Sequence, residues 1–94
     1  MNFKIKYHKL VAAIDIPELP RTIKQQVRDA IERKLVLAPD KFGKPLRRSL
    51  KGYRKLRAGD YRIVFRISGH TVFILAIQHR KKVYFKIHNR MLVL

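Results

Sequence analysis

The segment HRKKVY, residues 79–84, places an imidazole, three cations and a phenol within six positions. More cations stand upstream at Lys55, Arg57, Arg62 and Arg66. Guanidinium and ammonium groups bind phosphate oxygens, and imidazole, amine and phenol groups can transfer protons. This set of residues therefore predicts a site that holds a phosphodiester and moves protons around it. The alternative is a solvated basic surface without chemistry, since runs of Lys and Arg are common surface features.

Positive charge dominates the composition, with 23 Lys and Arg against 6 Asp and Glu and a net charge of +17. The excess lies in residues 41–94, where Asp60 is the only acidic residue. Such a one-sided field favours an anionic partner, and nucleic acid is the commonest one. An acidic protein or an anionic membrane surface would satisfy the same field.

The chain has no Cys, so disulfides and thiolate metal sites are excluded and a reducing compartment fits best. The longest apolar run, residues 71–77, is too short to cross a bilayer, and residues 1–8 alternate charge with hydrophobicity instead of forming a signal core. No pair of histidines has the spacing of a metal site, and no carboxylate pair accompanies them. We therefore expect a cytoplasmic protein of one domain, residues 1–94, without membrane, metal or cofactor.

Two hydrophobic periods divide the chain. The helical period covers residues 21–35, and a short helical stretch at 9–14 is expected to end at Pro17 and Pro20. Residues 38–52 contain several turn formers and are expected to be a connector. Five segments show the period of a strand: 3–8, 53–57, 60–67, 70–77 and 83–87. The order predicts an α+β fold of two layers, with one or two helices on one face of a mostly antiparallel sheet of four or five strands.

Alternation along the strands decides which side chains share the face left open by the helices. In the strand 60–67 the odd-numbered residues from Tyr61 are apolar and must meet the helices, so the even-numbered residues point away. In the strand 53–57 Leu56 points inward, with Arg54 near the rim. The open face is therefore expected to collect Lys55, Arg57, Arg62, Arg66, His79, Arg80 and Tyr84.

Residues 49–84, SLKGYRKLRAGDYRIVFRISGHTVFILAIQHRKKVY, resemble the RelE/ParE superfamily of toxins from bacterial type II toxin–antitoxin systems. The shared pattern is L-x-G-x-x-K-L-R-x-G-x-Y-R, then a hairpin and a strand that ends in H-R-x-x-V-Y. The upstream helix and the segment DKFGKPL extend the resemblance over nearly the whole chain. One branch of this superfamily cleaves mRNA in the ribosomal A site, and another shares the scaffold and poisons DNA gyrase.

The resemblance implies that basic and aromatic active-site positions of the ribonuclease branch are matched by Lys55, Arg57, Arg62, Arg80 and Tyr84. Where a ribosome-dependent member has an additional lysine on the second strand, this chain has Tyr53. The resemblance also implies three partners: mRNA, the ribosome, and an antitoxin whose acidic segment covers the basic face of a toxin monomer within a larger complex. We therefore expect an mRNA-cleaving toxin. The alternatives are a gyrase inhibitor without nuclease chemistry, and a non-catalytic RNA-binding or antitoxin-only module that has lost toxicity.

A ribonuclease of this kind uses the 2′-hydroxyl of RNA as its nucleophile, so the protein must move protons and stabilise phosphoryl charge. Arg62 and Arg80 are expected to stabilise that charge, and Lys55 is the candidate base because neighbouring arginines oppose its charge. Tyr84 is expected to share a proton or stack on a base, or else to be an aromatic at the edge of the core. His79 is the candidate acid for the leaving oxygen, or it simply ends a strand. Six further cations are expected to contact RNA: Lys51, Arg54, Arg57, Arg66, Lys81 and Lys82.

Overall fold

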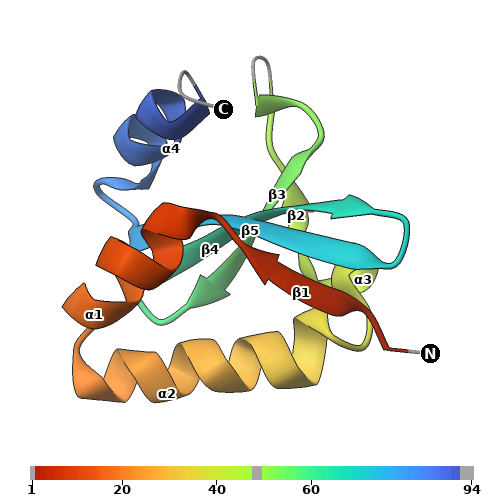
Figure 1. Ribbon diagram of the computed structural model, residues 1–94, viewed down its shortest axis with the longest axis horizontal. Coiled ribbons are helices and arrows are strands. Elements are labelled where there is room, and N and C mark those ends of the chain that lie inside the picture. Colours follow the sequence, from red (N-terminus) through yellow and green to blue (C-terminus); the bar gives the residue numbers. More distant parts are fainter. Residues whose placement is uncertain (1, 48–49, 92–94) are drawn as a thin grey trace.

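Three consecutive strands form the centre of the sheet in a computed structural model that describes residues 2–47 and 50–91 (Figure 1). They are β3 (Tyr53–Ala58), β4 (Tyr61–Ser68) and β5 (Thr71–His79), and adjacent strands are antiparallel. The two outer strands are β1 (Lys4–Tyr7), parallel to β5, and β2 (Lys44–Pro45), antiparallel to β3. The sheet order is therefore β1-β5-β4-β3-β2, which confirms the predicted α+β class with a mostly antiparallel sheet of five strands.

Helical segments connect β1 to β2 and follow β5. After β1 the chain forms η1 (Val11–Asp15), a π-helical turn, then α1 (Ile16–Glu18), α2 (Arg21–Ala30), the π-helical turn η2 (Ile31–Leu35) and α3 (Pro39–Phe42); α4 (Val83–Met91) follows β5. Helix α2 and η2 together cover the stretch predicted as one helix. None of the helices in residues 2–47 and 50–91 is long and apolar enough to span a membrane.

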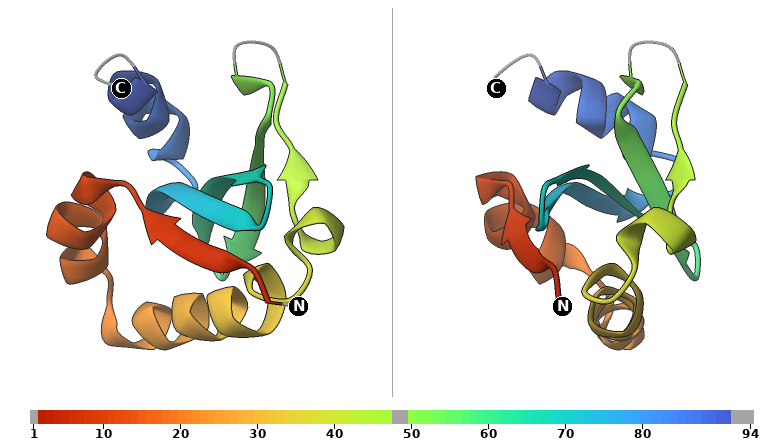
Figure 2. Two further views of the ribbon diagram at one scale, coloured as in Figure 1. Left: turned by 45° about the vertical axis from the view of Figure 1, so that its right-hand side comes forward. Right: turned by 90° about the vertical axis from the view of Figure 1, so that its right-hand side faces the viewer.

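Helices cover both faces of the sheet, as Figure 2 shows for α2 and α4. On the α2 side, Val27, Ile31 and Leu35 pack against Ile63 and Phe65 of the sheet, as the predicted alternation requires. On the other side, α4 buries two side chains in a second cluster, formed by Val83, Ile87, Val64, Leu75, Ala76, Leu46 and Leu50. The expectation that helices occupy only one face is therefore wrong, because α4 covers part of the face that was expected to be open.

The segment 83–87 was expected to be a strand, and this prediction is wrong. Val83, Ile87 and Arg90 are buried and recur at spacings of four and three residues, which places them on one face of a helix. A window of five residues fits both the strand and the helix period, so the sequence pattern alone could not separate them.

Two further boundaries differ from the expectation. The connector 38–52 contains α3 and β2, since Pro39 is tolerated in the first turn of a helix. The early helical segment continues to Glu18, because Pro17 also lies in a first helical turn, and it ends before Pro20.

A β-bulge in β5 changes which face its last residues reach. Val64 pairs with Ala76 and Phe65 pairs with Ile74, so Leu75 is the extra residue. Leu75 and Ala76 both join the cluster under α4. The alternation after the bulge is therefore reversed, and this reversal determines where His79 lies.

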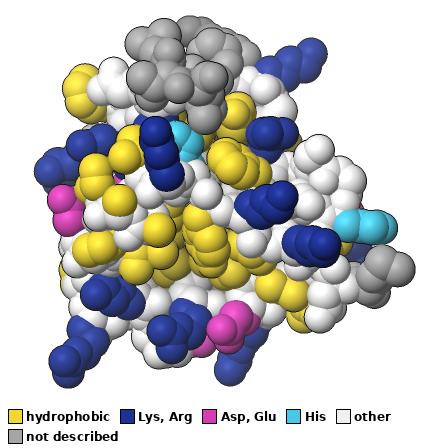
Figure 3. Space-filling view, viewed as in Figure 1, with side chains coloured by type: hydrophobic (Ala, Val, Ile, Leu, Met, Phe, Trp, Pro, Cys, Tyr) yellow, Lys and Arg dark blue, Asp and Glu magenta, His cyan; other side chains and the backbone are white. Residues whose placement is uncertain are grey.

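Cations are spread over the surface of the molecule. In Figure 3, viewed as in Figure 1, Lys and Arg side chains extend from the top, the rim and the lower helix, whereas few Asp and Glu side chains are visible. On this face most of the charged side chains in view are thus cations presented to solvent.

Candidate active site

Two strands place three cations next to one another on the α4 side of the sheet. The register of β3 and β4 sets Arg57 opposite Arg62 and Lys55 opposite Val64, the neighbour of Arg62 on the same face. Residues directly opposite in an antiparallel pair lie about 4.5–5.5 Å apart, and like charges at that distance repel. An anion that lies among these three side chains would remove the repulsion.

Helix α4 adds a phenol to these cations. Lys55 Nζ donates a hydrogen bond of 3.0 Å to the Tyr84 hydroxyl oxygen, and the ammonium lies 5.7 Å from the centre of the Tyr84 ring. Tyr84 is 43% exposed, Lys55 is half-buried and the hydrogen bond between them is exposed, so a ligand can reach the pair. The prediction that Tyr84 shares a face with Lys55 is confirmed, although Tyr84 belongs to a helix and not to a strand.

The two arginines are held by the turn that joins β3 to β4. Arg62 Nη1 donates to the carbonyl oxygens of Gly59 (3.1 Å) and Tyr61 (2.9 Å), and Arg57 Nε donates to Gly59 (3.3 Å). Gly59 has a φ of 62°, which a residue with a side chain adopts only at a cost. These bonds occupy Nη1 of Arg62, and its Nε and Nη2 have no partner within the described residues, so they remain available to a phosphoryl group.

Arg80 lies beside the same turn, in the connection between β5 and α4. Its backbone N–H donates to the Asp60 carbonyl oxygen (2.9 Å), and its Nε lies 3.8 Å from Asp60 Oδ1. The two side chains are 56% and 67% exposed, and an exposed ion pair at this distance contributes little stability. The guanidinium of Arg80 is therefore positioned by its backbone but can exchange Asp60 for another anion.

His79 does not join these residues, so the expectation that it shares their face is wrong. After the bulge in β5 its ring points to the α2 side, where it packs edge-on against Tyr61 with ring centres 5.3 Å apart. Its Nδ1 accepts a hydrogen bond of 3.2 Å from the backbone N–H of Lys81. His79 and Lys82 both line a cavity on this side of the sheet.

Arg54 also lies on the α2 side, near the rim, as the alternation predicts. Its Nη1 donates to the carbonyl oxygens of Gly43 (3.0 Å) and Asp40 (3.3 Å), which ties β3 to α3. A structural role thus accounts for this cation, and it is not part of the α4-side face.

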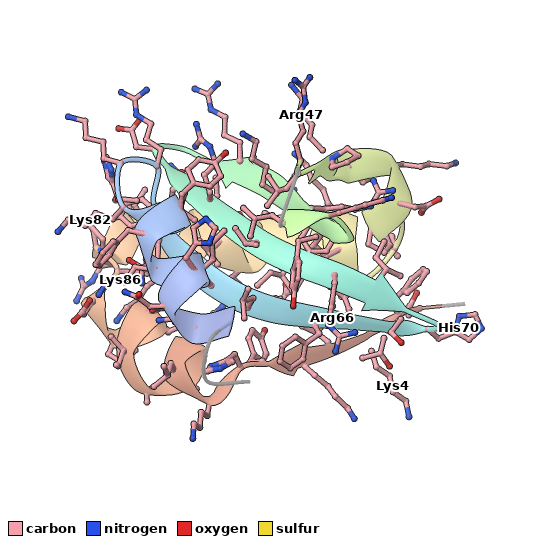
Figure 4. The ribbon with its side chains drawn as sticks, turned by 90° about the horizontal axis from the view of Figure 1, so that it is seen from above. Lys4, Arg47, Arg66, His70, Lys82 and Lys86 are labelled. Carbon is pink, nitrogen blue, oxygen red and sulfur yellow. The ribbon has the colours of Figure 1, made fainter. Side chains whose placement is uncertain are left out.

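The remaining predicted RNA contacts are dispersed. Arg66 is on the α4 side but four residues along β4 from Arg62, about 13 Å away, and its guanidinium lies 5.2 Å from the Phe73 ring centre. Lys51, Lys81 and Lys82 are exposed in turns. Figure 4 looks onto this face and shows Arg66 and His70 towards one end of the hairpin and Lys82 towards the other. The structure thus brings Lys55, Arg57, Arg62 and Tyr84 to one face and places Arg80 beside the turn that joins β3 to β4.

Comparison with known proteins identifies the family of this chain. The family model described as the ParE toxin of type II toxin–antitoxin system, parDE, matches residues 5–84. The chain belongs to the ParE toxin family. The predicted resemblance to the RelE/ParE superfamily of toxin–antitoxin systems is confirmed.

Two curated relatives from Mycobacterium tuberculosis (strain ATCC 25618 / H37Rv) are named Toxin RelE and Toxin RelG. This ParE-family toxin is 36% identical to the first over 83 residues, which is 83% of this chain and 86% of the relative. It is 39% identical to the second over 72 residues, which is 74% of this chain and 83% of the relative.

Solved structures of toxins share the fold. The toxin–antitoxin complex RelBE2 of M. tuberculosis matches with a TM-score of 0.77 and 33% identity, over 85% of this chain and 100% of that chain. A mutant of the E. coli toxin RelE in the free state matches with a TM-score of 0.71 over 96% and 98% of the two chains, and at 18% identity it supports the fold alone.

Two exposed side chains of α4 lie close to Tyr84 along the helix. His88 is exposed and stands four residues after Tyr84, so the two are neighbours along one side of the helix. Phe85 is 69% exposed beside Tyr84. The expected strand did not predict that these side chains lie near Tyr84 on a helix. The spacing of Val83, Ile87 and Arg90 was the signal for a helix here.

His8, at the end of the alternating pattern of residues 3–8, is buried and not exposed to solvent. His8 is only 5% exposed, and its Nδ1 accepts a hydrogen bond of 3.1 Å from the backbone N–H of Leu10. Burial lowers the pKa of His8, and the charges of Arg90 and Lys9 lower it further, while Asp15 raises it.

No group of three or more His, Asp or Glu side chains able to hold a metal ion occurs in residues 2–47 and 50–91.

Proposed function

We propose that this ParE-family toxin is an endoribonuclease that cleaves mRNA, in association with the ribosome, by attack of the ribose 2′-hydroxyl on the adjacent phosphate. The observation that carries the proposal is the Lys55–Tyr84 hydrogen bond beside the opposed arginines Arg57 and Arg62. These groups match the needs of the reaction: proton transfer at two oxygens and cations for the phosphoryl charge. The names of the curated relatives, RelE and RelG, support the ribonuclease branch.

Lys55 and Tyr84 form the proton-transfer pair. The Lys55 ammonium first gives one proton to solvent, and the resulting amine takes the proton of the 2′-hydroxyl as the new bond from that oxygen to phosphorus forms. The Tyr84 hydroxyl gives its proton to the 5′-oxygen as the bond from phosphorus to that oxygen breaks. The 3.0 Å hydrogen bond between the two side chains then returns a proton from Lys55 to Tyr84. Tyr84 thus takes the role first considered for His79, whose ring lies on the other side of the sheet.

The arginines bind the phosphoryl group. Arg62 and Arg57 are fixed on the Gly59 turn, so their positions do not have to be organised when RNA binds. A guanidinium group can donate two parallel hydrogen bonds to a phosphate, and it keeps its charge at any physiological pH. Arg80 joins them by exchanging its exposed contact with Asp60 for a phosphoryl oxygen. Because RNA supplies the nucleophile itself, this reaction requires no metal-bound water.

Other exposed cations extend the RNA contact beyond the scissile phosphate. Arg66 lies on the same face as Lys55, and Lys51, Lys81 and Lys82 are exposed in the turns around it. Each contact of this kind releases counterions from the RNA and makes binding depend on salt.

An antitoxin with an acidic segment is the second partner. The structures of toxin–antitoxin complexes among the similar proteins, RelBE2 of M. tuberculosis and RelB–RelE of Methanococcus jannaschii, support such a pairing. A segment rich in Asp and Glu would occupy the same cations as RNA does, so antitoxin and RNA would compete for one face. A monomer of the toxin within a larger complex is the expected assembly.

The test is a reconstituted translation system programmed with one mRNA. The protein is expected to cut that mRNA at defined positions within codons, and Arg62→Ala or Arg80→Ala is expected to abolish cutting without changing the fold. Arg33→Ala, an exposed arginine of η2 on the other side of the molecule, is the matched control. DNA breaks that depend on gyrase, with the mRNA intact, would instead assign the protein to the gyrase-inhibiting branch.

A further inference from the structure

A buried ion pair joins the last turn of α4 to the region between β1 and α2. Arg90 is 5% exposed and Asp15 is 1% exposed. Arg90 Nη1 and Nη2 donate to Asp15 Oδ2 (2.6 Å) and Oδ1 (2.5 Å), so the contact is bidentate. Gln78 Nε2 donates to the same Oδ1 at 2.5 Å. This pair belongs to neither the proposed chemistry nor the surface charge.

The ion pair bonds to backbone groups of β5 that lie beyond the end of its neighbour β1. β1 pairs with β5 only as far as Tyr7 opposite Ile74, and within residues 2–47 and 50–91 no strand lies beside the edge of β5 beyond that point. Asp15 Oδ2 accepts the backbone N–H of Ile77 (2.8 Å), and Arg90 Nη1 donates to the carbonyl oxygen of Leu75 (2.9 Å). The pair thus satisfies backbone groups that would otherwise be buried without partners. It also fixes α4 to the backbone of the sheet.

Apolar packing alone holds α4 weakly. The helix has nine residues, and an isolated helix of that length is marginal in water. Among residues 83–90, Val83 and Ile87 are the buried apolar side chains. Contacts of this kind are not directional, so they permit the helix to rotate or slide, whereas a bidentate contact between a guanidinium and a carboxylate permits one arrangement.

We propose that Arg90 and Asp15 are positioning residues, which hold α4 so that the Tyr84 hydroxyl stays within hydrogen-bonding reach of Lys55. The pair does not touch RNA and acts through α4, and its part in catalysis rests on the proposed ribonuclease function. Displacement of a catalytic group by about 1 Å can lower a rate about a hundredfold. Loss of the pair is therefore expected to lower kcat, while KM stays within about twofold because Arg57, Arg62 and Arg66 lie on the sheet and not on α4.

The first variant is Arg90→Lys, which keeps the charge and loses the bidentate fork, with Arg33→Lys as the matched exposed control. Arg90→Lys is expected to lower kcat about tenfold, and amide hydrogen exchange of residues 85–90 is expected to become at least about tenfold faster while β3 and β4 are unchanged. Should Arg90→Lys fail to fold, the double variant Asp15→Asn/Arg90→Gln keeps a neutral hydrogen-bonding pair and is expected to show the same two effects.

A double-mutant cycle with Tyr84→Phe tests the route of the effect. Positioning through Tyr84 requires that Arg90→Lys slows cleavage much less, by under about twofold, when the Tyr84 hydroxyl is already absent. An equal loss of kcat in both backgrounds would overturn the positioning role, as would unchanged exchange in α4. The exchange measurement needs no RNA: if the unaltered protein cuts no mRNA, the proposed function fails, and exchange in the same variants still decides whether the pair holds α4.

Discussion

Replacement of Tyr84 by phenylalanine separates proton transfer from base stacking at the proposed centre. Tyr84→Phe removes the oxygen that accepts the 3.0 Å hydrogen bond from Lys55 and keeps the ring. General acid–base catalysis contributes about 10²–10⁴-fold, so kcat is expected to fall at least about a hundredfold, or about 2.7 kcal/mol of barrier. The free energy of unfolding is expected to change by less than about 1 kcal/mol, because Tyr84 is 43% exposed and water can replace the hydroxyl.

The assay is single-turnover cleavage of one mRNA on programmed ribosomes, with ribosome concentration varied so that kcat and KM are separated. Tyr7→Phe is the matched control, since Tyr7 is 42% exposed and lies on β1, away from Lys55. Tyr84→Ala is the second variant and removes the ring as well. It is expected to raise KM in addition, because an aromatic that stacks on a base contributes about 1–3 kcal/mol.

One result would refute the proton-transfer scheme. If Tyr84→Phe cleaves at the rate of the unaltered protein while Tyr84→Ala loses affinity, then Tyr84 is only a stacking platform. Lys55 would then have to exchange protons with RNA or solvent without its partner on α4.

Three further measurements probe the electrostatics and packing. Arg62→Ala is expected to lower the slope of log affinity against log salt by about 0.7 for a non-cleavable single-stranded RNA, whereas Arg54→Ala leaves it unchanged, since Arg54 bonds to carbonyl oxygens on the other side of the sheet. The lowered pKa of His8 means that the unfolded chain binds its proton more readily, so urea unfolding is expected to show full stability above about pH 6.5 and a loss as the pH falls below it. Gly43→Ala is expected to lower the free energy of unfolding by about 1–3 kcal/mol, because the added carbon would overlap the Phe65 ring.

Each of these expectations has a contradicting outcome. An unchanged salt slope in Arg62→Ala would show that this guanidinium does not contact phosphate. The pH dependence should disappear in His8→Gln and persist in His70→Gln, since His70 is exposed in a turn, and the reverse would remove His8 as its cause. A melting temperature of Gly43→Ala equal to that of the unaltered protein would mean that Phe65 moves aside without cost.

Most of the fold could be predicted from periodicity, because α2, β3 and β4 are long enough to show their pattern clearly. Ile23, Val27, Ile31 and Leu35 repeat at the helical spacing, and all but the half-buried Ile23 are buried. The C-terminal segment could not be predicted in this way. The five residues 83–87 fit both the strand period and the helix period. The contacts of Val83 and Ile87 with the sheet select the helix.

The candidate site was predictable where one regular strand pairs with another. Strict alternation along β3 and β4 placed Lys55, Arg57 and Arg62 on one face, and the register confirms this placement. Alternation failed for His79, because the bulge at Leu75 reverses the faces of the residues that follow. A bulge depends on how two strands fit together, so the sequence of one strand does not reveal it.

Local patterns in the sequence determined the elements, the excess of positive charge and the group of cations on the central strands, because these properties depend on residues close together along the chain. The tertiary structure decided the rest. It brought Tyr84 to Lys55 across 29 positions and Arg90 to Asp15 across 75. Such contacts arise only when distant segments pack, because the burial of α4 against the sheet, and not any local propensity, selects the arrangement in which they form.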